Sequence, residues 1–139
     1  MLKKVVACTL LAFAAQAGFA AATAAPEDAR AYIISPKDGE TVTSPVRVQF
    51  GLEGIGVAPA GVAWANTGHH HLLVNVDDLP GFDKPIPADA QHIHFGGGQT
   101  EAQVELEPGE HSLQLLLGDH LHIPHTPPVV SEKITIIVE

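Results

Sequence analysis

The stretch GHHHLLVNV (residues 68–76) contains the predicted central β-strand of the chain, residues 70–76. Successive side chains of a strand point to opposite faces of its sheet, so the stretch divides into two sets. One face would carry His70, Leu72, Val74 and Val76. The other face would carry His69, His71, Leu73 and Asn75. The strand therefore separates one histidine, which shares a face with aliphatic side chains, from two histidines that lie together on the opposite face.

Short segments with alternating or continuous apolar residues lie on both sides of this strand. They span residues 31–35, 46–50, 92–95, 101–106, 111–117 and 129–138. Turn-forming residues separate several of them, as in Pro36-Lys37-Asp38-Gly39 and Pro108-Gly109. About seven such strands without a helical period predict an all-β fold, an antiparallel β-sandwich of the immunoglobulin-like type. A cupin or jelly-roll barrel is the alternative.

Residues 1–25 have the order of a secretory signal peptide. Lys3 and Lys4 precede an apolar run over residues 5–15, and small residues continue to Ala25. Cleavage motifs of the A-x-A type occur at residues 20–22 and 22–24, which predicts cleavage between residues 20 and 25. The apolar run is shorter than the ~20 residues of a membrane span. The sequence thus predicts a signal peptide (1–25) and a single His-rich domain (26–139), periplasmic or secreted and without a membrane span.

The composition of the predicted mature domain limits the classes of ligand and partner that it could bind. Removal of Lys3 and Lys4 leaves 5 basic residues against 16 acidic ones, a net charge near −11 with neutral histidines. Such a field repels nucleic acid and attracts cations. The domain contains no cysteine and, after loss of Met1, no methionine. Blue copper sites need cysteine and are therefore excluded. The predicted partner is a metal ion, and the sequence leaves any protein partner unknown.

All nine histidines lie between residues 69 and 125, and six of them form three His-x-His pairs. Such a pair places two imidazoles on one face of an extended chain, ~6–7 Å apart at Cα. Both can then reach one ion with metal–nitrogen bonds of ~2.0–2.1 Å. The candidate metal ligands are His69, His71, His92, His94, His120, His122 and His125. Imidazole ligands without sulfur predict a divalent transition metal, with copper favoured over zinc by intrinsic affinity.

Two histidines and one carboxylate near these pairs fit a structural role as well. His70 and His111 share faces with strand leucines, which is equally consistent with core packing and with metal ligation. Asp119 could accept a hydrogen bond that orients an imidazole, or it could cap the turn after Gly118.

Four motifs together resemble a family of bacterial exported domains of unknown function. They are GHHHLL (68–73), HIHFGGGQT (92–100), the segment PGEHSLQLLLGDH (108–120) and HIPHTPPVVS (122–131). The resemblance covers roughly residues 66–139. It implies an exported, bacterial, His-rich domain. It implies no activity, and no functional residue is carried over from it.

Three functions remain compatible with the sequence. The first is a periplasmic copper or zinc carrier, buffer or resistance factor that uses the clustered histidines. The second is a His-ligated metalloenzyme, because HIHFG resembles the His-x-His segment of copper–zinc superoxide dismutases and of cupins. The disulfide cysteines of the former are missing, however, and Glu101 lies too far from His94 for the latter. The third is a structural or adhesive immunoglobulin-like module. No serine or cysteine nucleophile motif occurs, which favours binding over catalysis.

Overall fold

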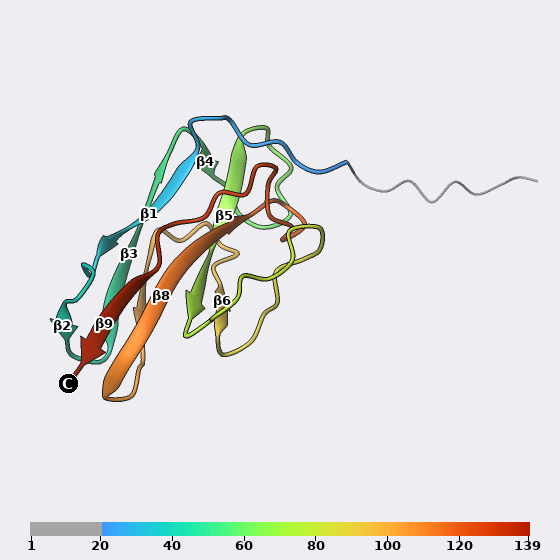
Figure 1. Cartoon of the computed structure of the whole chain (residues 1–139). Coiled ribbons are helices and arrows are strands. Elements are labelled where there is room, and N and C mark those ends of the chain that lie inside the picture. Colours follow the sequence, from blue (N-terminus) through green and yellow to red (C-terminus); the bar gives the residue numbers. More distant parts are fainter. Residues whose placement is uncertain (1–20) are drawn as a thin grey trace, which may run out of the picture.

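The computed structural model describes residues 21–139, which form a β-sandwich of nine strands (Figure 1). Most of the predicted signal peptide, residues 1–20, lies outside the described residues. The strands are β1 (Arg30–Ser35), β2 (Thr41–Val42), β3 (Val46–Glu53), β4 (Gly56–Val57), β5 (Thr67–Val74), β6 (His92–His94), β7 (Glu101–Val104), β8 (Gly109–Gly118) and β9 (Ile134–Val138). Within residues 21–139, no helix is long and apolar enough to cross a membrane.

The strands form two sheets. The smaller sheet has the order β1-β3-β7, and the larger one has the order β2-β9-β8-β5-β4, with the short strand β6 also paired to β5. Only the β2–β9 and β4–β5 pairs are parallel. Neither sheet closes into a barrel, so the predicted β-sandwich is confirmed and the barrel alternative is wrong.

The main hydrophobic core lies between the two sheets. Strand β3 contributes Val46, Val48 and Phe50 from alternating positions, and β8 contributes Leu113, Leu115 and Leu117 from the facing sheet. These leucines are fully buried, and each such side chain contributes ~1.5–3 kcal/mol relative to an exposed one. The alternation read from the sequence therefore decides which face of each strand enters the core.

A second apolar cluster covers the outer face of the larger sheet. Leu73 of β5 and Leu116 of β8 point away from the main core and pack against Ile86, which belongs to the long connection between β5 and β6. The same connection reaches the loop after β8, because the Ile86 amide donates to the His122 carbonyl at 2.8 Å. Loops thus form a partial third layer over one end of the larger sheet.

The seven predicted strands all occur, with changed bounds. The central strand spans Thr67–Val74 instead of 70–76. The predicted strand over 129–138 is regular only from Ile134, and Val130 makes an isolated bridge to Leu116. The two-residue strands β2 and β4, which the sequence did not predict, add short parallel edges.

Candidate metal centre

Four histidines converge on the outer face of the larger sheet. One ring nitrogen from each of His69, His71, His94 and His122 lies within 4.8 Å of the others. The six distances between their ring centroids run from 4.7 to 6.1 Å. Segments that are far apart in the sequence therefore bring four imidazoles to one point.

Strand pairing places three of these histidines. His69 and His71 occupy alternate positions of β5, on the face opposite to the core residue Leu72, and both are fully buried. His94 lies directly opposite His71 in the antiparallel register of β5 and β6. Opposite residues of a ladder share a face, so the His94 ring packs 5.1 Å from the His71 ring. His94 itself is exposed at the edge of the site.

His122 comes from the loop after β8 and has a left-handed backbone, with φ of 65°. The Asp119 carboxylate holds this loop, because its Oδ1 accepts from the amides of Leu121 at 2.8 Å and Ile123 at 3.0 Å. The His122 amide donates to the Asp119 carbonyl at 2.9 Å. An uncommon backbone conformation at a candidate ligand is typical of a functional constraint, and here it turns the ring toward β5.

Two glycines give the rings the space they occupy. A Cβ atom at Gly118 would lie 2.7 Å from Cε1 of His71, and one at Gly96 would lie 2.3 Å from Cε1 of His94. Gly118 also stands opposite His69 in the β5–β8 ladder. Side chains at these positions would displace the imidazoles, which gives a steric reason for glycine in the GDH and HFG segments.

Burial favours the neutral form of His69, His71 and His94. Burial, together with the nearby His122 and His94, lowers the pKa of His69 to about 4. Burial together with His69 lowers the pKa of His71 to about 3. Desolvation and His122 also lower the pKa of His94. Metals bind the neutral imidazole, so these three residues can bind a cation near neutral pH without first releasing protons.

The donor atoms fit a transition-metal ion. Nε2 of His69 lies 3.1 Å from Nδ1 of His122. With metal–nitrogen bonds of ~2.0–2.1 Å, neighbouring donors around one ion are about 2.9–3.4 Å apart, in square-planar or tetrahedral geometry. Nδ1 of His71 is buried and has no hydrogen-bond partner among the described residues. A small inward movement of the rings would complete a four-nitrogen coordination sphere.

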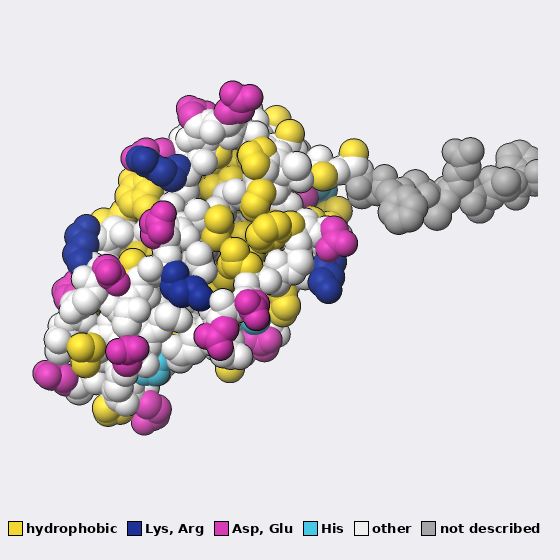
Figure 2. Space-filling view, viewed as in Figure 1, with side chains coloured by type: hydrophobic (Ala, Val, Ile, Leu, Met, Phe, Trp, Pro, Cys, Tyr) yellow, Lys and Arg dark blue, Asp and Glu magenta, His cyan; other side chains and the backbone are white. Residues whose placement is uncertain are grey.

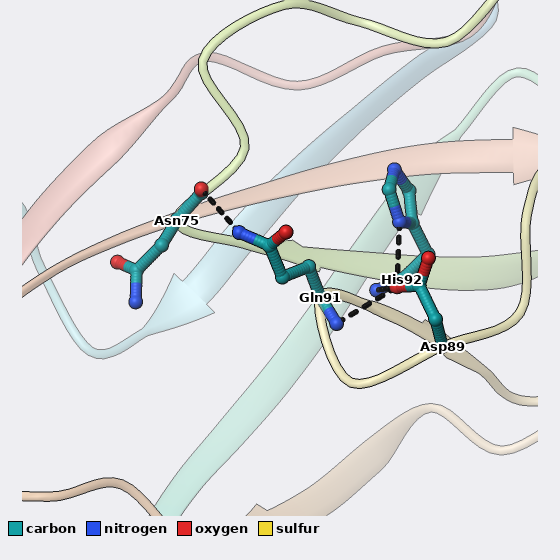
Figure 3. Close-up of polar contacts among 4 residues, drawn as sticks. All are labelled: Asn75, Asp89, Gln91 and His92. Carbon is teal, nitrogen blue, oxygen red and sulfur yellow. Dashed lines mark hydrogen bonds and ion pairs between the residues drawn. The ribbon is translucent and has the colours of Figure 1, made fainter.

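Two members of the predicted His-x-His pairs, His92 and His120, do not belong to the four-histidine cluster. Figure 3 shows His92 turned to Asp89, whose Oδ1 lies 2.8 Å from Nδ1 of His92 and also accepts from the amides of Gln91 and His92. The hydrogen bond from His92 lowers the pKa of Asp89. Gln91 ties this turn to β5 through the Asn75 carbonyl. His92 is therefore part of a local turn, although it shares a strand with His94.

His120 and His125 also lie outside the four-histidine cluster. His120 borders a small pocket with Phe82 and Leu121, and its carbonyl accepts from the Gly61 amide. His125 is fully buried, and its Nε2 lies 3.0 Å from the Thr67 carbonyl. The structure thus brings together His69, His71, His94 and His122 of the seven predicted ligands.

The sequence left two possible roles open for His70, His111 and Asp119. In the structure, each of these residues makes contacts of a structural kind. His70 lies in the main core, with its ring 5.1 Å from that of Phe50, and burial lowers its pKa to about 4. His111 lies at the far end of β8, where its ring contacts the Asn75 side chain and the Glu107 carbonyl. Asp119 caps the loop and accepts a bond at 2.6 Å from Thr23, a residue that sequence reasoning placed in the signal peptide.

Comparison with known proteins places the chain in a family without describing its chemistry. No curated protein and no solved structure gives a significant match. Residues 48–139 match a family described as a domain of unknown function, DUF4399. The matched region contains every strand from β5 onward and all four clustered histidines. The chain belongs to this DUF4399 family.

Proposed function

We propose that this domain binds a single divalent transition-metal ion, Cu(II) in preference to Zn(II), and acts as an exported metal carrier or buffer. The observation that carries the proposal is the convergence of four imidazole nitrogens within 4.8 Å. Three of these residues have lowered pKa values, which favours metal over proton at neutral pH.

The ligand set supports binding rather than catalysis. Catalytic zinc sites typically use three protein ligands and leave a position for water or substrate, whereas four protein ligands close the coordination sphere. No carboxylate belongs to the cluster among residues 21–139. Asp119, whose charge acts on His69, is already engaged by hydrogen bonds from Thr23, Leu121 and Ile123. A carrier or buffer needs only tight and reversible binding.

Donor chemistry and charge support the identity of the ion. Neutral imidazoles suit Cu(II), Zn(II) and Ni(II), and copper binds most tightly in the Irving–Williams order. Acidic side chains outnumber basic ones on the face shown in Figure 2, as they do in the whole chain. The resulting negative field would raise the local concentration of cations. The signal-like N-terminus supports delivery to the periplasm or the medium, where a resistance or buffering role would operate.

Titration of the chelator-stripped protein with Cu(II) and Zn(II) at pH 7.4 tests this proposal. We expect saturable binding of one ion per chain, with copper tighter than zinc. Electron paramagnetic resonance of the copper form should show several nitrogen ligands. His71→Ala should weaken binding by at least about 10-fold, because it removes a buried ligand. His92→Ala is the matched control, since His92 lies on the neighbouring strand but bonds Asp89.

Three results would overturn parts of the proposal. Weak, non-stoichiometric binding would remove the metal function and favour a structural module. Equal losses in His71→Ala and His92→Ala would reject the four-histidine assignment. Metal-dependent turnover of superoxide or of an organic substrate would make the centre catalytic.

A further inference from the structure

The segment just before β1 is attached to the loop that carries His122. The Ala25 amide donates to the Thr126 carbonyl at 3.1 Å, and the Thr126 amide donates to the Thr23 carbonyl at 2.9 Å. Ala24 and Thr126 therefore form a parallel bridge. In Figure 1 the blue N-terminal segment runs beside the orange loop that follows β8. Residues 23–25 thus lie along the outside of the loop as a strap.

The strap is connected to the metal centre through one carboxylate. The Thr23 hydroxyl donates to Oδ2 of Asp119 at 2.6 Å, while Oδ1 of Asp119 accepts from Leu121 and Ile123. Those two amides flank His122 and hold it in its left-handed conformation. Asp119 is almost fully buried. Burial alone would raise the pKa of Asp119, but the hydrogen bonds from Thr23, Ile123 and Leu121 lower it below its ordinary value.

We infer that Thr23 is a positioning residue for His122 and that the mature chain retains it. Of the two A-x-A motifs in the predicted cleavage window, residues 20–25, the one at residues 22–24 would release Thr23 with the leader. The motif at residues 20–22 leaves Thr23 at the start of the mature chain. Of these two cuts, only the earlier one preserves the Thr23–Asp119 bond. The strap lies outside residues 48–139, the region that the family model matches.

Substitutions at Thr23 test the positioning role, which rests on the proposed metal function. In protein that begins at Thr23, with its native N-terminus, Thr23→Val removes the hydroxyl at nearly constant shape. We expect about 10-fold weaker Cu(II) binding, the scale for loss of a residue that orients a ligand. The copper spectrum should change, and the amides of Leu121 and Ile123 should exchange faster. Thr23→Ser should restore all three properties. Thr43→Val, at an exposed threonine beside β2, should change none of them.

Copper affinity and amide exchange together separate this inference from the proposed function. Protein that binds no copper would contradict the metal centre, while amide exchange in the metal-free protein would still decide whether the strap holds the loop. Unchanged affinity and unchanged exchange in Thr23→Val would overturn the positioning role. Failure of Thr23→Ser to restore exchange would overturn it as well, because the serine hydroxyl can make the same bond.

The N-terminus of the exported protein tests the processing step. The full chain would be produced in a bacterium, recovered from the periplasm and analysed by intact mass. We expect a mature chain that begins at Thr23. A chain that begins at Ala25 or Pro26, or one that is not cleaved, would contradict the assignment. Protein produced to begin at Ala25 provides the comparison, and it should show the weakened copper binding of Thr23→Val.

Discussion

At the scale of single residues, His122 combines a left-handed backbone with a ring in the cluster. Asparagine tolerates this backbone conformation but offers no imidazole, so His122→Asn separates the two roles. We expect at least about 10-fold weaker copper binding. The free energy of unfolding of the metal-free protein, measured with urea, should stay near the wild-type value. His122→Val should bind as weakly and also lose about 1–2 kcal/mol of stability, because a β-branched residue is strained there. Equal stability of the two variants would contradict the backbone argument.

Gly118 offers a second test at the scale of single residues, because its missing side chain leaves space for the His71 ring. A methyl group there would meet Cε1 of His71 at 2.7 Å and Cα of His122 at 3.3 Å. Gly118→Ala removes no ligand, yet we expect weaker copper binding and a changed copper spectrum. Overpacking of this kind costs about 1–3 kcal/mol. Gly56→Ala is the control, since its nearest neighbour would lie 3.5 Å away. Spectra of Gly118→Ala and wild type that coincide would show that the His71 ring has another available position.

The sequence predicts the histidines of β5 better than those of the loops. Period-two alternation correctly separated His70, which faces the core, from His69 and His71, which face the site. The same argument could not distinguish His94 from His92, because the difference is a hydrogen bond to Asp89. Nor could it select His122 over His120, since that choice depends on a left-handed residue held by Asp119. Contacts between distant segments decide these cases, and strand periodicity carries no information about them.

At the scale of elements, the four clustered histidines differ in how many strand contacts hold them in place. His69 and His71 belong to β5, which pairs with β8 along six residues, whereas His94 belongs to the three-residue strand β6. β6 pairs only with β5, and His94 is exposed. Local opening requires least free energy where few buried contacts hold a segment. We therefore expect the metal to enter and leave on the His94 side of the centre.

A comparison of two ligand substitutions tests this direction of exchange. His94→Ala should leave three ligands on firm elements and bind copper with faster release to a chelator in stopped-flow measurements. Added imidazole should fill the vacant position and slow the release again. His69→Ala should lose most of the affinity, and imidazole should not restore it, because that position is fully buried. Rescue of both variants to the same extent would reject an exchange route at β6.

The elements themselves follow from the sequence, while their layering does not. Apolar alternation located all seven predicted strands. Residues 77–91 show no such alternation and contain three prolines, yet Ile86 within this connection covers Leu73 and Leu116. A single apolar residue in a proline-rich loop does not indicate which sheet face it covers. The partial third layer that encloses the centre was therefore not predictable.

At the scale of the whole molecule, buried neutral histidines link folding to pH. The pKa values of His69 and His70 are lowered from 6.5 to about 4, and that of His71 to about 3. Above pH 6.5 these residues are neutral in both the folded and the unfolded chain, so they add no pH dependence. Below pH 6.5 the unfolded chain binds protons that the folded chain excludes, and stability falls as the pH decreases toward 4. Each histidine contributes a slope of about 1.4 kcal/mol per pH unit in this window.

Urea unfolding of the metal-free protein at pH 7.5, 6.0 and 5.0 measures this slope. His70→Leu should reduce it by about one proton, because His70 is buried in the core and is not one of the clustered ligands. Asp89 and Asp119 do not obscure the result, since their lowered pKa values place their titration below this window. Saturating copper should oppose the loss at pH 6.0, because an ion that binds only the folded chain adds its binding free energy to stability. Equal stability of the metal-free protein at pH 7.5 and 5.0 would mean that these histidines accept protons without unfolding, and the sealed outer face of β5 would have to open to solvent.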